Sequence, residues 1–333
     1  MVLLRPSPRL LLARYLLYWL NSPALEAHVW GFRDGTVAER LNLPTIRGLP
    51  IAVPPLAEQR AIARILGSLD DKIELNRRMN RTLEELAAAI FKSWFVDFHP
   101  VVARAEGRQP FGMDADTAAL FPAEFEESEA GPVPTGWRVA PIGELVKVVG
   151  GTTPGTGNPA YWEDGAIAWA TPKDLAGLAD TVLLDTERHI TQTGLQQISS
   201  GLLPAGTVLM SSRAPVGYLA IAEMPVAINQ GFIALICDRG LPNYYVLHWL
   251  RENMESIVNR ANGTTFLEIS KANFRPIPAL VPSDPVLRRF TQVAGKLQGM
   301  IVANVRESRT LAAIRDTLLP KLMSGEIRVS AGG

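Results

Sequence analysis

The chain has 333 residues with a formal net charge of zero, and 47% of the residues are hydrophobic while 20% are charged. This composition is typical of a globular protein with a hydrophobic core, and the length allows two or three domains. The neutral balance provides no overall basic field for nucleic acid or for an anionic membrane. Cys237 is the only cysteine, which excludes an intrachain disulfide and a thiolate metal cluster and fits a reducing cytoplasm.

The first twenty residues are rich in leucine but lack the pattern of a targeting segment. Arg9 and Arg14 interrupt the apolar run, and no small-residue cleavage site follows. We therefore expect an amphipathic helix that packs on neighbouring elements. The segment "LPIAVPP" further on ends in Pro54 and Pro55, and proline disfavours helix in the residue before it.

A long helix is predicted over residues 54–97. No proline occurs between Pro55 and Pro100, and the only glycine there is Gly67. Apolar residues recur every seven positions, as in a coiled coil, and Asn76 occupies one position of this seam. A buried Asn at such a position lowers stability and fixes the register of the helix pair. The apolar members of the repeat are Ile62, Leu69, Leu83 and Ile90.

The C-terminal region repeats this helix at an offset of 228 residues. The match places Gly67 on Gly295 and Asn76 on Asn304, and it predicts a second long helix over residues 283–328. If the two helices pair antiparallel, Asn76 faces Asn304, and their side-chain amides can satisfy each other. Asn76 and Asn304 are therefore predicted to set the register of the pair.

The segments that precede the two helices also repeat. "LLYWLNS" before the first helix resembles "VLHWLRE" before the second, and Gly35-Thr36 falls on Gly263-Thr264. Thr264 and Thr265 therefore belong to an element common to both halves, which favours a structural or backbone-contact role over specificity. One internal repeat of this length indicates a duplicated half rather than a solenoid.

The region between the helices changes character. Residues 98–134 hold seven acidic residues and two arginines and are rich in proline and glycine, which predicts a partly ordered acidic linker. Residues 135–282 contain short β-like runs such as "LVKVV", "AIAWA" and "FIALIC", followed by the helical "NYYVLHWLRENMESIV". The prediction is an α+β fold, in which mixed globular domains are separated by two long antiparallel coiled-coil helices.

The chain offers little for catalysis. The glycine-rich stretch from Gly150 to Trp162 lacks the Gly-Lys-Ser/Thr ending of a phosphate-binding loop. "NPAY" at residues 158–161 is similar to the Asn-Pro-Pro-Tyr signature of amino-methyltransferases, but its second proline is missing and no glycine-rich cofactor motif accompanies it, which favours a turn. The four histidines have no metal-ligand spacing. The sequence therefore predicts neither catalytic residues nor a metal site.

Several motifs together resemble the specificity subunits of Type I restriction–modification systems. The long helices carry "PPLAEQRAI", "AAAIFKSWFVDF" and "IRDTLLPKLMSGEI". The domain between them carries "GGTTP", "AWATPKDL", "LPAGTVLMSSRAPVGYLAI", "AINQGF" and "GTTFLEISKANFRPIPALVPS". The resemblance covers nearly all of the chain apart from the acidic linker and the first dozen residues.

The resemblance implies a non-catalytic, cytoplasmic DNA-binding subunit. In that family two target-recognition domains each read half of a split target in double-stranded DNA, and the long helices dock methyltransferase subunits. S-adenosylmethionine, ATP and Mg are then expected on the methyltransferase and the restriction/translocase subunits, and this chain would hold no cofactor. Two alternatives are a coiled-coil interaction module that does not bind DNA, and a stand-alone methyltransferase or nuclease, whose motifs are absent.

The chain departs from the family pattern at its start. More than a hundred residues separate Trp137 from Trp249 in the domain at 135–282, whereas eighteen residues precede the corresponding Trp19. Residues 1–53 are therefore expected to be the C-terminal remnant of a first recognition domain. Two copies paired through the long helices could then read a symmetric target.

Candidate DNA contacts lie in loops at the predicted strand ends. Arg213 is the leading candidate, as a bidentate guanine contact or a phosphate contact, with a structural ion pair to Asp174 or Glu223 as the alternative. Asn229 and Gln230 could recognise adenine or hold a turn. Because the domain is not basic, phosphate contacts must come from a local patch or from partner subunits. The full candidate set is Thr152, Thr153, Thr171, Lys173, Ser211, Ser212, Arg213, Asn229, Gln230 and Lys271.

Aromatic residues crowd the end of the first long helix. Phe91, Trp94, Phe95 and Phe98 would mark a partner-binding surface if they were exposed. The alternative is that they pack beneath the neighbouring recognition domain.

Overall fold

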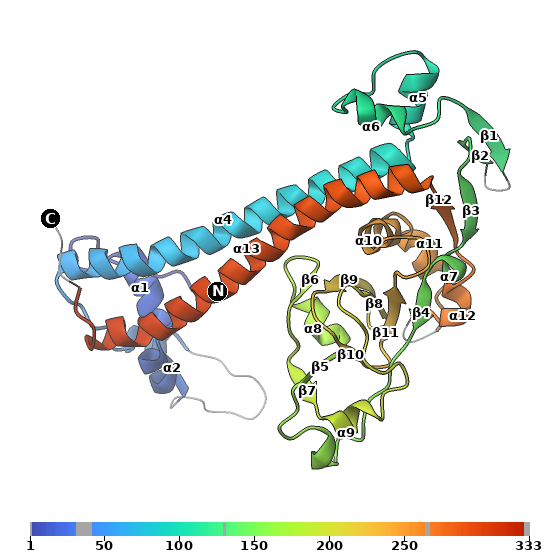
Figure 1. Ribbon diagram of the computed structural model, residues 1–333. Helices are drawn as coiled ribbons and strands as arrows, with labels where there is room; N and C mark the ends of the chain where they lie inside the picture. The colour runs from blue at the N-terminus through green and yellow to red at the C-terminus, as the bar shows by residue number, and fades with distance from the viewer. Residues whose placement is uncertain (1, 31–41, 129–130, 264–266, 330–333) are drawn as a thin grey trace. The chain divides into compact units, whose positions relative to one another are not determined.

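The computed structural model describes residues 2–30, 42–128, 131–263 and 267–329. The repeated residues Gly35, Thr36, Thr264 and Thr265, which carry the predicted common role, lie outside these ranges. The chain divides into two compact units, one formed by Met1–Arg78 with Ala303–Gly333 and the other by Met79–Val302. The two long helices, α4 (Leu56–Phe95) and α13 (Asp284–Ser324), contribute to both units (Figure 1).

The first unit packs short helices on one end of each long helix. Helices α1 (Ala13–Leu20), α2 (Pro23–Trp30) and α3 (Leu43–Arg47) precede α4. Asp70 of α4 contacts Arg315 of α13, and Asn76 contacts Asn304, so the two helices run antiparallel here. The core of this unit consists of Tyr15, Tyr18, Ile62, Leu66, Leu319, Leu322 and Met323.

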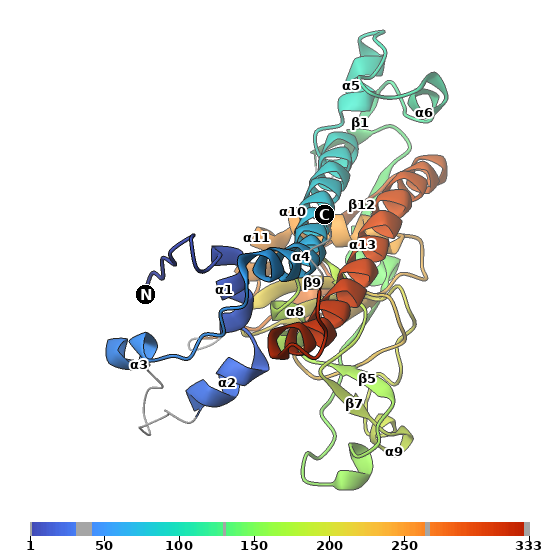
Figure 2. The same cartoon turned by 90° about the vertical axis from the view of Figure 1, so that its left-hand side faces the viewer.

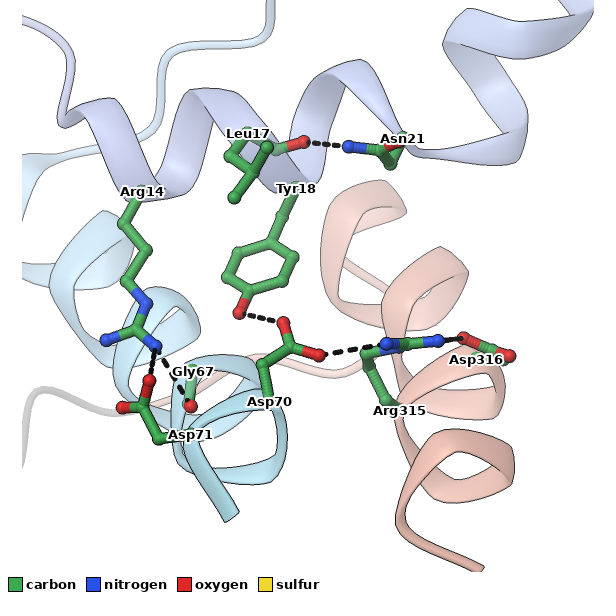
Figure 3. Close-up of polar contacts among 9 residues, drawn as sticks. All are labelled: Arg14, Leu17, Tyr18, Asn21, Gly67, Asp70, Asp71, Arg315 and Asp316. Carbon is green, nitrogen blue, oxygen red and sulfur yellow. Dashed lines mark hydrogen bonds and ion pairs between the residues drawn. The ribbon is translucent and has the colours of Figure 1, made fainter. Parts of the chain in front are cut away.

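Figure 3 shows how α1 is attached to the long helices in the first unit. The Arg14 guanidinium donates to the main-chain carbonyl of Gly67 at 3.0 Å and to Asp71 at 2.5 Å. The Tyr18 hydroxyl donates to Asp70 at 2.5 Å, and the same carboxylate accepts from Arg315 at 2.9 Å. A β-carbon on Gly67 would lie 2.6 Å from Arg14 Cζ, so the glycine makes room for the guanidinium.

Asn76 lies beside Asn304, as an antiparallel pair requires, but its amide is satisfied differently from the prediction. The Asn76 side chain is fully buried, and its Nδ2 donates to Glu307 at 2.8 Å and to Ser308 at 3.2 Å. Its contact with Asn304, at 3.4 Å, goes to the main-chain carbonyl. The role of the two asparagines in setting register stays a prediction.

The second unit is built on a five-stranded sheet with the order β4-β11-β8-β9-β6. Neighbouring strands are antiparallel except β6 and β9, which are parallel. A three-stranded sheet has the order β10-β5-β7, and two strand pairs, β1-β2 and β3-β12, complete the β-structure. The bounds are β1 Phe125–Ser128, β2 Gly131–Pro134, β3 Arg138–Pro141, β4 Lys147–Val149, β5 Ile167–Ala170, β6 Val182–Leu183, β7 Arg188–Ile190, β8 Val208–Ser212, β9 Val216–Ala222, β10 Ala227–Ile228, β11 Phe232–Ile236 and β12 Pro278–Val281.

Short helices surround these sheets. They are α5 His99–Ala105, α6 Ala115–Ala119, α7 Ile142–Leu145, the 3-10 helix η1 Pro159–Tyr161, α8 Pro172–Ala176, α9 Gln192–Leu195, α10 Asn243–Glu252, α11 Met254–Asn259 and α12 Lys271–Phe274. The segment at 98–134, predicted to be an acidic linker, forms α5, α6 and the β1-β2 pair. It also buries Val101 and Phe121 in the main core of the unit, so its apolar residues attach it to the domain despite its acidic composition. The mixed α+β class and the pair of long helices are confirmed.

The aromatic residues at the end of α4 are part of that core. Phe91, Trp94 and Phe95 are buried, and their rings contact Phe290 of α13 at 5.1–6.0 Å between centroids. Phe98 is partly buried against Phe125 and Trp137. The prediction of an exposed partner-binding cluster at Phe91, Trp94, Phe95 and Phe98 is therefore wrong, because these rings pack in the hydrophobic core of the second unit.

The sequence repeat is visible in the packing of α1 and α10 on the long helices. The Tyr15 hydroxyl of α1 donates to the carbonyl of Ala52 at 3.0 Å. The Tyr245 hydroxyl of α10 donates to the carbonyl of Leu280 at 2.8 Å, and Leu280 lies 228 positions after Ala52. In each unit, therefore, a tyrosine of the short helix binds a main-chain carbonyl just before the long helix.

No single helix within the described ranges is long and apolar enough to cross a membrane. The pair formed by α4 and α5, bent by 44°, reaches that threshold by length and composition alone.

Candidate nucleic-acid interface

Candidate DNA-contacting residues that lie near the ends of three strands come together at one edge of the five-stranded sheet. The register pairs Phe232 of β11 with Ser211 of β8, and Ala234 with Val149 of β4, so the end of β4, the end of β8 and the start of β11 share an edge. Thr153, just after β4, donates to the Gln230 side chain at 2.6 Å. The antiparallel order of the strands thus brings together residues that are far apart in the sequence.

Lys271 and Arg213 lie at the same edge. A β-carbon on Gly150 would be 3.3 Å from Lys271 Nζ, which places this ammonium group over the end of β4. Arg213 follows β8, and its guanidinium is 3.6 Å from Glu268, with 38% of its side chain exposed. The carboxylate beside Arg213 is therefore Glu268, so the structural ion pair given as the alternative role of Arg213 is present with a different partner from those named.

The loop at residues 150–157 is held in place from several sides. A β-carbon on Gly151 would lie 1.8 Å from the carbonyl oxygen of Ile228, so only glycine fits there. Thr152 donates to the carbonyl of Gln197 at 2.8 Å and accepts from the amide of Ser199 at 3.1 Å. Because its hydroxyl is engaged in this way, Thr152 positions the loop rather than presenting a free polar group.

Two indoles complete the support of this loop. Trp169, which is buried, donates to the carbonyl of Thr152 at 3.4 Å, and Trp162 donates to the carbonyl of Gly155 at 3.1 Å. The two indole rings meet edge to face with their centroids 5.0 Å apart. The loop is thus fixed by contacts within the domain itself.

Other candidates serve the fold. Ser211 is fully buried, donates to the carbonyl of Pro215 at 2.7 Å and accepts from the amide of Tyr218 at 2.8 Å. Ser212 is also buried, and its main-chain amide donates to the carbonyl of Gly231 at 2.8 Å. These two side chains have almost no surface to offer a base, so the prediction that they contact DNA does not fit this geometry.

Thr171, Asn229 and Lys173 are also engaged locally. Thr171 caps α8 in a capping box with Asp174. The Asn229 side chain accepts from the amide of Gly231 at 2.8 Å, so Asn229 holds a turn, which was the alternative to adenine recognition. Lys173 is exposed but forms an ion pair with Glu187 at 2.7 Å. A hydrogen bond to Glu187 raises the Lys173 pKa, so its charge is retained but is partly offset by the neighbouring carboxylate.

Arg188 belongs to this region and was not among the predicted residues. It opens β7, an edge strand of the three-stranded sheet, which Figure 2 shows beside β5 and α9. Its guanidinium lies 3.6 Å above the centroid of the Trp162 ring and 5.4 Å from that of Trp169. The sequence held no motif that linked Arg188 to either tryptophan, because only the pairing of β5 with β7 brings them together.

Two titratable side chains of the second unit have pKa values shifted by burial. No group of three or more His, Cys, Asp and Glu among the described residues could hold a metal ion. Burial raises the pKa of the Cys237 thiol to about 12, so the thiol stays protonated. Burial, helped by the charge of Arg251, lowers the pKa of His248 to about 4, and this histidine is neutral at physiological pH.

Comparison with known proteins places these observations in a family. The family model for the Type I restriction modification DNA specificity domain matches residues 1–85 and 134–286. The HindI specificity subunit of Haemophilus influenzae is 27% identical over 89% of this chain and 72% of its own length. The MjaIX specificity subunit of Methanocaldococcus jannaschii is 32% identical over 57% of this chain and 44% of its own length.

A solved structure shares the fold. The crystal structure of the S subunit of a Type I restriction–modification system from M. genitalium covers 95% of this chain and 74% of its own length, with 17% identity and a TM-score of 0.54. The family model covers well over half of the chain, including most of α4 and the part of the region between the long helices from residue 134 onward. The chain therefore belongs to the family of Type I restriction–modification DNA specificity subunits.

Proposed function

We propose that this chain is the non-catalytic subunit that selects the DNA target of a Type I restriction–modification complex. The domain at 135–282 would read one half of a split target in double-stranded DNA. The observation that carries this proposal is the single sheet edge at which Thr153, Gln230, Arg213 and Lys271 meet. Polar and cationic side chains from several strand ends are the groups that DNA readout requires, and the family membership supplies the substrate class.

The long helices are the proposed docking surface for methyltransferase subunits. Support comes from the length of α4 and α13 and from the names of the relatives, which are parts of restriction enzymes. S-adenosylmethionine would belong to the methyltransferase subunits, and ATP with Mg to the restriction/translocase subunit. The proposed location is the cytoplasm, where the target DNA lies.

We also propose that two copies can assemble through the long helices. Each copy would contribute the domain at 135–282, and a twofold arrangement of two identical domains reads a palindromic split target. A chain that works alone, or together with a different specificity subunit, would read an asymmetric target.

The proposal is tested by expressing the chain with a methyltransferase subunit of the same restriction–modification system and mapping methyladenine in the DNA. A split motif that depends on the chain would support the proposal, and the methyltransferase without the chain is the control. A palindromic motif would support two copies, and an asymmetric motif would contradict them. Methylation without any motif, or no methylation, would refute target selection by this chain.

The neutral charge favours one competing function, a coiled-coil interaction module with a globular head that does not bind DNA. Specific DNA binding releases counterions, so its affinity falls steeply with salt concentration. Binding of the assembled complex to DNA that is absent, or that does not change with salt, would support this alternative.

A further inference from the structure

Two of the cations near the candidate interface have a carboxylate partner. Lys173 pairs with Glu187 at 2.7 Å, and Arg213 lies 3.6 Å from Glu268. Within the described part of the chain, Arg188 has no carboxylate partner, and its side chain lies on an aromatic ring instead. Its charge is therefore available to an anionic or strongly polar ligand.

The contact with the Trp162 ring restrains the Arg188 guanidinium. The group lies 3.6 Å over the Trp162 ring, and Trp162 is in turn held by Trp169 and by its hydrogen bond to Gly155. Arginine stacks well on an indole face while its N–H groups remain directed outward in one plane. Because this geometry is set before any ligand arrives, little side-chain entropy is left to lose on binding.

Lys271 supplies the second cation, at the other end of the same loop. Its ammonium group lies near Gly150 at the start of the loop at 150–157, whereas Arg188 lies on Trp162, which is hydrogen-bonded to Gly155 near the end of that loop. No ion pair involves Lys271 among the residues described. A compact ammonium on a flexible chain suits a phosphate, whereas a fixed planar fork suits the N7 and O6 acceptors of guanine.

We propose that Arg188, stacked on Trp162, recognises a guanine base through its N7 and O6 atoms, and that Lys271 contacts the DNA backbone next to it. This inference rests on the proposed function, because it names the residues by which the domain would read its half-site. It also supplies the local basic patch that a domain of neutral composition needs in order to hold DNA.

The test compares Arg188→Lys, Arg188→Ala and Lys271→Gln in the complete methyltransferase complex. Arg188→Lys keeps the charge but not the planar fork, so one G·C position of the methylated motif should relax by about tenfold to a hundredfold. Lys271→Gln should leave the motif unchanged, weaken binding to all sequences alike, and reduce the slope of log affinity against log salt by about one. Arg239→Ala is the matched control, because this exposed arginine lies beyond the opposite end of β11.

Three outcomes would overturn the proposal. If both Arg188 variants weaken every sequence equally and the motif stays intact, Arg188 contacts phosphate and not guanine. If neither variant changes the motif or the affinity, Arg188 does not touch DNA. If the wild-type complex has no motif at all, the proposed function fails together with this inference. Melting curves of the variants establish that the changes come from binding and not from unfolding.

Discussion

Glu84 joins the long helix α4 to the α+β domain of the second unit. Its carboxylate accepts from the amide of Thr181 at 2.9 Å, from the Thr181 hydroxyl at 2.8 Å, and from the Arg251 guanidinium at 2.9 Å. Only 20% of the Glu84 side chain and 28% of the Arg251 side chain are exposed. Replacing Glu84 therefore leaves three donors without their acceptor in a poorly hydrated place.

The expected cost follows from these contacts. A hydrogen bond to a charged group contributes about 1.5–3 kcal/mol, and breaking a fully buried ion pair costs about 3–5 kcal/mol. Because this pair keeps some access to water, we expect Glu84→Ala to lower the free energy of unfolding by about 2–3 kcal/mol. Glu84→Gln keeps an acceptor for Thr181 and should cost about 1–2 kcal/mol.

Urea unfolding, followed by tryptophan fluorescence, measures this change. The control is Glu85→Ala, an exposed neighbour on the same helix, which should change stability by less than about 0.5 kcal/mol. The double variant with Arg251→Ala should cost less than the sum of the two single changes, because both remove one interaction. Strict additivity, or a Glu84→Ala protein as stable as the Glu85→Ala control, would refute this reasoning.

The same carboxylate predicts a pH dependence. Burial raises the pKa of Glu84, but the charge of Arg251 and the hydrogen bonds from Thr181 outweigh it, so the net pKa is lowered. A lowered folded-state pKa means that the ionised group stabilises the fold above its unfolded pKa of about 4.3, and that this stabilisation is lost as pH falls through the folded value. The difference between wild type and Glu84→Gln should therefore be full at pH 7 and shrink in acid below about pH 4.

Three further substitutions test other parts of the fold. Gly151→Ala should destabilise the fold by about 3 kcal/mol or prevent folding, because the added β-carbon would lie 1.8 Å from a carbonyl oxygen of β10. The control is Gly157→Ala, which has open space around it and should leave the thermal unfolding curve nearly unchanged. Phe91→Ala should cost about 3–5 kcal/mol in urea unfolding, against under about 1 kcal/mol for the exposed Leu86→Ala. Asn76→Leu should raise the melting temperature, since an apolar residue stabilises a helix seam more than a buried amide does; a lower value would show that its bonds to α13 outweigh that gain.

The long elements could be predicted because their signals are local and repeated. Helix α4 covers Leu56–Phe95 where the heptads predicted 54–97, and α13 covers Asp284–Ser324 where they predicted 283–328. The packing of the segment at 98–134 could not be read from its composition. Its acidic residues dominate the sequence, whereas a few apolar side chains such as Phe121 decide where it lies.

The candidate site was harder to predict because strand pairing assembles it. Residues at strand ends could be named, and Thr153, Gln230 and Lys271 do lie at one edge. The sequence could not show which polar residues face the interior. Ser211 is buried because of its position within β8, and its residue type gives no sign of this. Arg188 was missed because its partner Trp162 lies in a different element and is brought near by the β5–β7 register.

The two halves of the sequence repeat keep similar helix packing but differ in the polar side chains at equivalent positions. Asp70 in the first unit accepts from Tyr18 and from Arg315. The sequence repeat places Gln298, His248 and Ala87 at the equivalent positions, and all three line one small cavity in the second unit. The arginine that would neutralise an acid is thus an alanine there, and the acid itself is a neutral amide. A poorly hydrated carboxylate without a cation partner is costly, and in the second unit the acid and the arginine that pairs with it are both absent from these positions. The tyrosines that bond to the carbonyls of Ala52 and Leu280 need no such exchange, because a hydroxyl on a main-chain acceptor is neutral in both units.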